Sequence, residues 1–552
     1  MIRALAAALA LLALPAPALA DTLFDSVDGI AIAKDGTVDR FVAMVVDDEG
    51  RIKALLDKGD KPAGPITYRV DGKGRTIIPG FVDSHIHLMD LGLGTLTLDL
   101  SQTSSLAEAQ SRLAAYAAAH PDRPWLLGFG WNHDKWGLGR FPTAAELDAV
   151  VSDRPVWLMR ADGHAGWGNS LALAAGNITA ASRDPEGGRI ERLPGSRAPA
   201  GVLVDNARQS IEAAIPPPLP EDRDLALHNA QNLLLAAGIT AVADMGTSID
   251  DWMTYRRAGD AGRLRLRVMS YADTVDNMLL IGGPGPTLWL YDDRLHMGGV
   301  ELYLDGALGS RGAMLLAPYA DDPKNSGLSL MSGTQLRNVM SRAALDGFQV
   351  AINAIGDAAN REALYAIEEL SGDYAGDRRW RIEHAQVVNP ADIPLFGKHG
   401  VIASMQPVHQ TSDRLMAEAR LGPERLPGAH AWRSLAAAGA PLAFGTDAPV
   451  QALDPLAGLA VAVSRTDVNG EPAGGWFPQE VVSREQALAA YTAGAAWAGF
   501  AEGRFGSLAP GERADFVVLS ADPLASTAED LRNIRVVETW IAGQKAHDSA
   551  RN

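Results

Sequence analysis

The chain of 552 residues contains no cysteine, few histidines for its length and more acidic than basic side chains. Without thiols it can form no disulfide, and a metal site would depend on His, Asp, Glu or modified Lys ligands. The formal net charge is −18. There is no cluster of Lys and Arg of the kind that displaces counterions from a phosphate backbone, so a nucleic-acid partner is not expected.

The first twenty residues have the pattern of a secretory signal peptide. Arg3 supplies a positive charge, residues 4–14 form an apolar core, and Ala18 and Ala20 give a small-x-small cleavage site. This apolar run is shorter than a membrane-spanning helix requires. We therefore expect residues 1–20 to be a cleaved signal peptide. We expect the mature protein to be periplasmic or secreted and to have no membrane anchor after cleavage.

Both ends of the remaining chain are rich in short Val and Ile runs separated by polar turns, as in β-hairpins. Neither end alone has enough strands to build a core. We expect residues 21–80 and 503–552 to meet in one small β-sandwich domain.

Between the two ends, short apolar runs alternate with helical patterns. Eight such runs, each followed by a helix-like segment, predict an α/β fold in which residues 81–502 form a (β/α)8 TIM-type barrel. The runs begin near residues 81, 239, 264, 300, 349, 380, 401 and 441.

Residues from about 121 to 220 do not follow this alternation and carry several tryptophans among Gly, Pro and Asp. We interpret them as a long insertion after the first barrel strand, on the face where loops build active sites. Clustered Trp is more often packing than ligand contact, and here both roles stay open. We expect Trp131 to line a substrate pocket.

Ligand-capable residues stand at the ends of the predicted strands. His85 and His87 are two apart, so they share a face at the end of the first strand. Active sites of such barrels lie at the carboxyl ends of the strands. The pattern predicts a metal centre there, with further residues from the fourth, fifth, sixth and eighth strands: Glu301, Asn353, His384 and Asp447.

At these positions the chain resembles the amidohydrolase superfamily, and within it amidohydrolase family 3. The resemblance covers nearly the whole mature chain and is carried by residues 74–87, 161–170, 305–311, 354–357, 382–385, 445–449 and 508–515. It implies a hydrolase that holds a divalent metal, most simply zinc, through His85, His87, Glu301, His384 and Asp447.

Two positions depart from the family pattern. Glu301 stands where the family usually has a carboxylated lysine that bridges two metals, and Asn353 stands where it has a histidine. An alternative for Glu301 is an ion-paired carboxylate. Because an amide oxygen is a poor zinc ligand, Asn353 is better interpreted as a residue that orients the substrate. The sequence is compatible with either one or two bound metal ions.

The resemblance also implies a mechanism. A metal lowers the pKa of a bound water towards neutrality, and Asp447 accepts the water's proton and passes it to the leaving amine. A donor such as His164 stabilises the oxyanion. We expect catalytic roles for Asp447 and His164, and substrate contacts from Asn353, Trp131, Arg311 and His409.

The expected reaction is hydrolysis of a non-peptide C–N bond, as in N-acyl or N-formyl amines or cyclic amides. The same barrel supports exported dipeptidases, lactonases and deaminases, and fold does not choose among them. A metal-poor binding protein with little turnover is a further alternative. The expected partner is a small-molecule substrate, and the sequence is compatible with a homo-oligomer.

Overall fold

The computed structural model describes residues 21–551. The predicted signal peptide, residues 1–20, lies outside this range. Within it, none of the helices is both long and apolar enough to cross a membrane.

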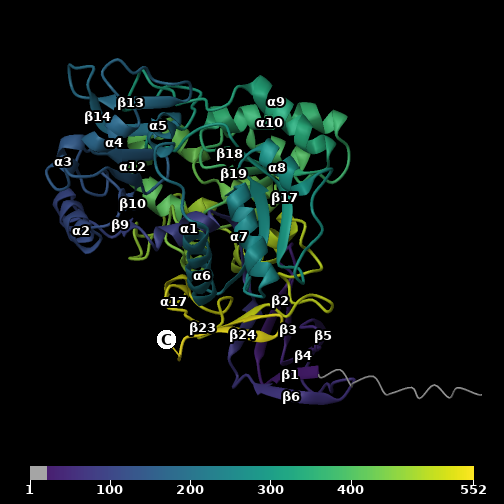
Figure 1. Cartoon of the computed structure of the whole chain (residues 1–552). Helices are drawn as coiled ribbons and strands as arrows, with labels where there is room; N and C mark the ends of the chain where they lie inside the picture. The colour runs from purple at the N-terminus through teal and green to yellow at the C-terminus, as the bar shows by residue number, and fades with distance from the viewer. Residues whose placement is uncertain (1–20, 552) are drawn as a thin grey trace, which may run out of the picture.

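Eight parallel strands form the central barrel (Figure 1), which confirms the TIM-type prediction. The last strand meets the first through backbone hydrogen bonds beyond its end: Asp447 N donates to His85 O over 2.8 Å. The strands are almost wholly buried, as parallel strands covered by helices are. In sheet order they are β8 (Phe81–Ile86), β15 (Ile239–Thr247), β16 (Arg267–Ala272), β17 (Leu295–Tyr303), β18 (Gln349–Ala354), β19 (Arg381–His384), β20 (Ile402–Met405) and β21 (Leu442–Phe444).

Helices surround these strands, and many begin at Ser, Thr or Asp caps. In α9 (Gly333–Leu345), Ser332 and Gln335 form a capping box, and buried Leu336 and Met340 lie one turn apart on the face towards the core. The other helices of the barrel region are α1 (Leu88–Gly94), α6 (Pro220–Ala236), α7 (Ile249–Asp260), α8 (Val275–Gly282), α10 (Asp357–Asp373), α11 (Ile393–His399), α12 (His409–Leu421), α13 (Trp432–Ala437), α14 (Pro455–Ser464), α15 (Arg484–Ala490) and α16 (Ala493–Ala498), with short 3-10 turns at Pro423–Gly428 and Pro478–Glu480.

The chain between α1 and α6 forms a six-stranded sheet with its own helices, which lies to the upper left of the barrel in Figure 1. It begins at Leu98, ahead of the boundary expected near residue 121. Trp131 and Trp167 are fully buried in its core. Its strands in sheet order are β13 (Gly188–Arg192), β14 (Pro199–Asp205), β12 (Ala165–Gly168), β11 (Val156–Arg160), β10 (Leu126–Trp131) and β9 (Leu98–Asp99). Its helices are α2 (Leu106–Ala119), α3 (Ala144–Asp148), α4 (Ser170–Ala175) and α5 (Gln209–Glu212), the last preceded by a 3-10 turn at Asn206–Arg208.

The two chain ends form two further sheets below the barrel in Figure 1. One consists of β5 (Ile52–Leu56), β4 (Ala43–Val46), β1 (Asp21–Asp25) and β6 (Ile66–Asp71). The other consists of β24 (Gln544–Asp548), β23 (Val536–Ile541), β22 (Phe516–Leu519), β7 (Thr76–Pro79), β2 (Asp28–Ile32) and β3 (Val38–Phe41), with the short helix α17 (Ala528–Leu531) between β22 and β23.

The six-stranded sheet of the chain ends is buried on both faces. Ile77 and Phe516 pack against the four-stranded sheet, whereas Ile78 and Val517 point the other way into the barrel core. This is the period-two alternation of strand side chains. The domain boundaries drawn from the sequence stay a prediction.

Candidate metal centre

His85 and His87 both direct Nε2 towards the barrel axis because Nδ1 is already engaged. Nδ1 of His85 lies 2.9 Å from Oε2 of Glu383, and Nδ1 of His87 lies 3.0 Å from the backbone oxygen of Met245. Both partners only accept hydrogen bonds, so each Nδ1 carries a proton, and in the neutral ring each Nε2 keeps a free lone pair. This is the arrangement in which imidazoles bind metals.

Glu383 is itself fixed by Arg381, two residues earlier on the same strand. The pair is fully buried, with Nε of Arg381 2.6 Å from Oε1 of Glu383. Burial alone would raise the pKa of Glu383, but Arg381 and His85 lower it to about 2. The carboxylate therefore stays charged and holds the His85 ring in place.

The end of β15 fixes His87 in a similar way. Asp244 accepts the backbone N–H of Leu88, the first residue of α1, over 2.9 Å, and also accepts a hydrogen bond from Tyr255. Burial raises the pKa of Asp244 to about 7. Because His87 precedes α1 directly, the contacts of Asp244 and Met245 set where its side chain points.

Two carboxylates approach these rings. Oδ1 of Asp447 lies 3.4 Å from Nε2 of His87 and 3.7 Å from Nε2 of His85, and Oε1 of Glu301 lies 3.7 Å from Nε2 of His85. The hydroxyl of Tyr303 donates to the other oxygen of Glu301 over 2.6 Å. The side chain of Glu301, on β17, therefore points into the site.

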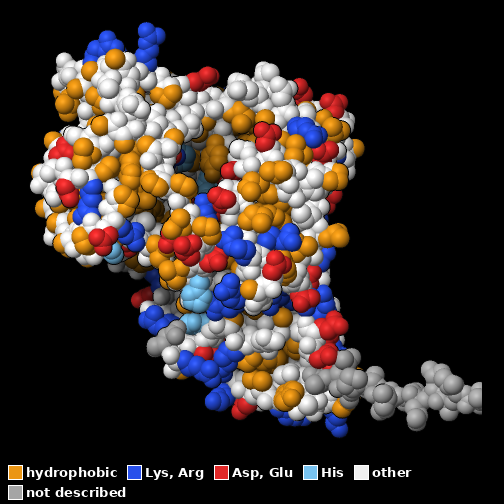
Figure 2. Space-filling model, viewed as in Figure 1, with side chains coloured by type: hydrophobic (Ala, Val, Ile, Leu, Met, Phe, Trp, Pro, Cys, Tyr) orange, Lys and Arg blue, Asp and Glu red, His pale blue; other side chains and the backbone are white. Residues whose placement is uncertain are grey.

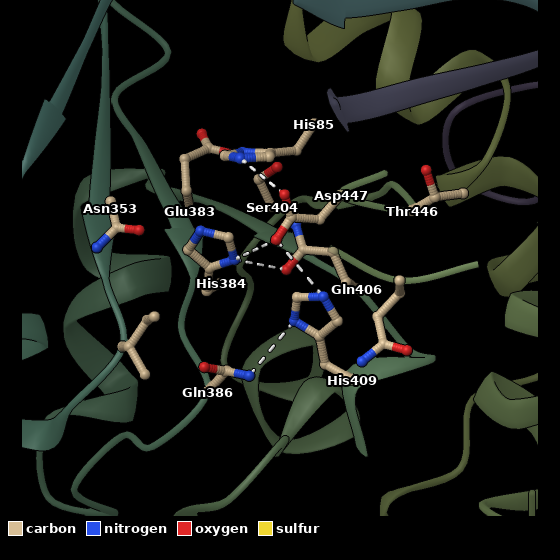
Figure 3. A network of polar contacts seen from close by, with 12 residues as sticks. His85, Asn353, Glu383, His384, Gln386, Ser404, Gln406, His409, Thr446 and Asp447 are labelled. Carbon is tan, nitrogen blue, oxygen red and sulfur yellow. Dashed lines mark hydrogen bonds and ion pairs between the residues drawn. The ribbon is translucent and has the colours of Figure 1, made fainter. Parts of the chain in front are cut away.

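His384 completes this side of the site. Its Nδ1 lies 2.9 Å from Oε1 of Gln406, and burial together with nearby His85 lowers the pKa of His384 to about 3. The neutral ring leaves Nε2 free for a cation. Ligand atoms of His85, His384 and Asp447 all lie within 4.8 Å of one another, and Figure 3 shows the three side chains converging.

These residues fit a divalent cation. Nε2 of His85, Oε1 of Glu301 and Oδ1 of Asp447 are buried and have no hydrogen-bond partner. Buried polar atoms are normally paired, and a shared ion would satisfy all three. Burial would lower the pKa of His87, yet Asp447 and Glu301 raise it to about 10, which shows how strongly the site favours positive charge.

Asn353 is held as a hydrogen-bonding residue. Its Nδ2 donates to the backbone oxygen of Asp305 over 2.9 Å. The carboxylate of Asp305 in turn accepts the backbone N–H groups of Ile355 and Gly356. The amide oxygen of Asn353 points towards His384 in Figure 3. The substrate-orienting role predicted for Asn353 stays a prediction.

His164 reaches the same cavity from the inserted sheet. Its Nδ1 lies 2.7 Å from Oδ1 of Asp205, at the end of β14. Burial lowers the pKa of His164, but the bond to Asp205 outweighs this and leaves the pKa above its ordinary value.

His409, at the start of α12, stands beside the metal-binding residues. Its ring is stacked on that of His384 with centroids 6.0 Å apart, and its Nε2 lies 3.5 Å from Oδ2 of Asp447. It lines the cavity, as do His164 and Asn353.

Two predicted substrate contacts are wrong. Trp131 is fully buried in the core of the inserted sheet, where its Nε1 donates to the backbone oxygen of Leu158. Arg311 pairs with Asp321 and does not line the cavity. The indole was needed to fill the hydrophobic core of the insertion, and the guanidinium neutralises a neighbouring carboxylate.

The cavity has a volume of about 1750 Å³ and is walled by both the barrel and the inserted sheet. Figure 2 shows it as a hollow between the two. Part of its lining is apolar, with several methionines: Phe129, Met159, Leu308, Met331, Ile355 and Met416.

A family model described as the amidohydrolase family matches residues 69–547. The chain belongs to this family. The predicted resemblance to amidohydrolase family 3 is thereby confirmed.

Several curated relatives are similar over most of their length. The chain is 34% identical to protein LONG AFTER FAR-RED 3 of Arabidopsis thaliana, over 88% of this chain and 84% of the relative. It is 32% identical to the putative amidohydrolase YtcJ of Bacillus subtilis, over 89% of this chain and 92% of the relative. It is 28% identical to N-substituted formamide deformylase of Arthrobacter pascens, over 87% of this chain and 90% of the relative.

Among solved structures, an uncharacterized metal-dependent hydrolase from Pyrococcus horikoshii matches with a TM-score of 0.73 and 26% identity, over 92% of this chain and 99% of that chain. A second uncharacterized metal-dependent hydrolase, from Pyrococcus furiosus, matches with a TM-score of 0.71 and 29% identity, over 91% of this chain and 100% of that chain.

Sequence reasoning missed the residues that orient the amidohydrolase site. Glu383 and Asp205 hold His85 and His164, yet each is far from its partner in the sequence. Arg381 and Glu383 share one face of a buried strand by their spacing. Two opposite charges on such a face could have signalled a buried ion pair.

Proposed function

We propose that this amidohydrolase cleaves the C–N bond of an amide other than a peptide, such as an N-acyl or N-formyl amine or a cyclic amide. The observation that carries the proposal is the set of three unpartnered buried atoms on His85, Glu301 and Asp447. A relative named N-substituted formamide deformylase supports C–N hydrolysis.

A divalent cation held by His85, His87, Glu301, His384 and Asp447 would supply the positive charge that makes water acidic and polarises a carbonyl. Zinc suits the imidazole and carboxylate donors. The Asp447 carboxylate takes the proton of the attacking water and passes it to the nitrogen as the C–N bond breaks.

His164 donates to the bound substrate from the inserted sheet. Because Asp205 accepts from Nδ1, the ring presents an Nε2–H to the cavity only when it is protonated. The raised pKa of His164 favours that form. Asn353 orients the substrate through its amide oxygen.

The apolar wall of the cavity favours an apolar group on one side of the amide. Methionine side chains are flexible and polarisable and adapt to ligands of different shape. The inserted sheet supplies part of this wall through Phe129, Trp157 and Met159, so one of its tryptophans lines the cavity. We propose an aliphatic or aryl substituent of moderate size.

The test combines metal analysis with substrate screening of the purified protein. We expect at least one tightly bound zinc per chain and turnover of amides in a panel that also holds esters, lactones and dipeptides. Asp447→Asn should lower kcat by about 10²- to 10⁴-fold, whereas Glu368→Gln, in an exposed ion pair with Lys398, should not. Less than one bound metal and no rate loss in Asp447→Asn would contradict the proposal.

We also propose that residues 1–20 direct export. N-terminal sequencing of the protein from periplasm or medium should give a mature chain that starts at Asp21. Full-length chain confined to the cytoplasm would refute this.

A further inference from the structure

His409 has one engaged ring nitrogen and one free one. Nε2 of Gln386 lies 3.4 Å from its Nδ1, while its Nε2 is buried, lines the catalytic cavity and has no hydrogen-bond partner. Figure 3 shows the ring between Gln386 and Asp447. Which nitrogen carries the proton decides what His409 can do.

Asp413 determines how the amide of Gln386 is turned. Oδ2 of Asp413 lies 2.8 Å from Nε2 of Gln386 and 2.9 Å from Nε2 of His430. A carboxylate accepts hydrogen bonds, so the amide of Gln386 must turn its NH2 group towards Asp413. The second N–H of that group then faces His409.

Since Gln386 donates to Nδ1 of His409, that nitrogen carries no proton, and the neutral ring is protonated on Nε2. Backbone hydrogen bonds also hold Gln386 and His430 in place. His430 N donates to the backbone oxygen of Gln386 over 2.7 Å, and Arg465 donates to the backbone oxygen of His430 over 2.7 Å.

The Nε2–H of His409 is therefore a donor, and a nitrogen in that state binds no metal. It lies 3.5 Å from Oδ2 of Asp447, without a hydrogen bond to it. An amide offers one good acceptor, its carbonyl oxygen, because the nitrogen lone pair is delocalised into the carbonyl group. The attacked carbon must lie next to the water whose proton Asp447 takes.

We propose that His409 binds the carbonyl oxygen of the substrate amide through Nε2–H and stabilises the negative charge that develops there, with Gln386 and Asp413 as positioning residues. This rests on the proposed function for the reaction, but the protonation state it requires can be measured without a substrate.

The first experiment is ¹⁵N-histidine NMR on the zinc-loaded protein and on the metal-free protein after chelation, with the His409 signal assigned by its loss in His409→Gln. We expect the Nε2–H form in both samples, while signals of His85, His87 and His384 change with the metal. A His409 signal in the Nδ1–H form, or one that shifts as those three do, would overturn the proposal and make His409 a metal ligand.

A pair of isosteric variants tests the positioning residues. Asp413→Asn lets residue 413 donate, so Gln386 can turn its oxygen to His409 and the Nδ1–H form should appear. Asp467→Asn changes another cavity-lining carboxylate, which pairs with Arg414, and should leave the His409 signal unaltered. An unaltered signal in Asp413→Asn would overturn the positioning role.

Kinetics test the catalytic role. His409→Leu should lower kcat by about 10²- to 10³-fold, as the loss of one oxyanion donor does, with a smaller change in KM. His409→Gln, which keeps an N–H at a similar reach, should recover part of kcat. A His409→Leu enzyme with kcat within about threefold of the unchanged protein would refute the role while the hydrolase proposal stands. Absence of any amide turnover would refute the hydrolase proposal and, with it, the role of His409.

Discussion

His164 and His409 line one cavity with opposite proton arrangements. Asp205 accepts from Nδ1 of His164, whereas Gln386 donates to Nδ1 of His409. The free nitrogen of His164 is consequently a donor only in the cation, and that of His409 is a donor in the neutral ring. The partner of Nδ1 thus determines in which protonation form each ring can donate a hydrogen bond from Nε2.

Asp205→Asn should move the alkaline limit of activity to lower pH. The bond to Asp205 raises the pKa of His164 against the effect of burial, so its loss lowers that pKa. Activity that needs protonated His164 is present below this pKa and is lost as the pH rises through it. The pH profile of kcat/KM measures the shift. Asp184→Asn, an exposed carboxylate of the same insertion paired with Arg192, serves as the control. A profile that does not move would contradict the donor role of His164.

Asn353→His should raise the metal content. If the amide has weakened a second site, the native protein holds about one zinc, and an imidazole at this position adds a ligand. Elemental analysis of both proteins gives the stoichiometry. A native content near two would show that Glu301 already bridges two ions and that Asn353 has not weakened a second site.

At this scale the sequence predicted the residues that bear ligand atoms but not the ones that orient them. His85, His87 and Asp447 could be found because a strand brings residues two apart to one face and ends at the barrel mouth. Glu383, Asp205 and Gln386 depend on which strands lie side by side. The substrate contacts predicted for Trp131 and Arg311 were wrong because residue type alone does not distinguish a side chain in a pocket wall from one in a core or an ion pair.

Among the elements, the inserted sheet is a folded unit with its own apolar core. The eight barrel strands were predictable because each is a short apolar run between turns. The third one is shifted, with β16 at Arg267–Ala272 instead of the expected run near residue 264. The inserted sheet was not predictable as a sheet, because it mixes parallel and antiparallel strands that are irregularly spaced along the chain.

Trp131→Ala should destabilise the protein by about 3–5 kcal/mol, since it empties a fully buried site and removes the bond to Leu158. Urea unfolding followed by circular dichroism measures this. Leu288→Ala, at a side chain that is 85% exposed, is the control and should change the free energy of unfolding little. A loss below about 1 kcal/mol for Trp131→Ala would show that the insertion core is not well packed.

In the molecule as a whole, a buried ion pair joins the barrel to the sheets of the chain ends. Nη2 of Arg267, on β16, donates to Oδ1 of Asp515 over 2.8 Å, and both side chains are almost fully buried. Arg267 also donates to the backbone oxygens of Asp292 and Asp293. The barrel and the end sheets are therefore joined by an ion pair as well as by apolar packing.

Asp515→Ala should lower stability by about 3–5 kcal/mol, because it leaves a buried guanidinium without its partner. Lys398→Met breaks an exposed pair with Glu368 and should cost less than about 1 kcal/mol. Thermal unfolding of the two variants gives the comparison. Equally small losses of stability in Asp515→Ala and Lys398→Met would show that the buried ion pair does not couple the barrel to the end sheets.

The position of β7 between β2 and β22 has a consequence for biosynthesis. β7 directly precedes the first barrel strand, yet one of its edges is paired only by residues 516–519, near the other end of the chain. A polypeptide emerging from a ribosome or a translocon cannot close this sheet until almost all of it has appeared. The nascent chain thus stays incompletely folded until late, and this delay is compatible with the export that we propose for residues 1–20.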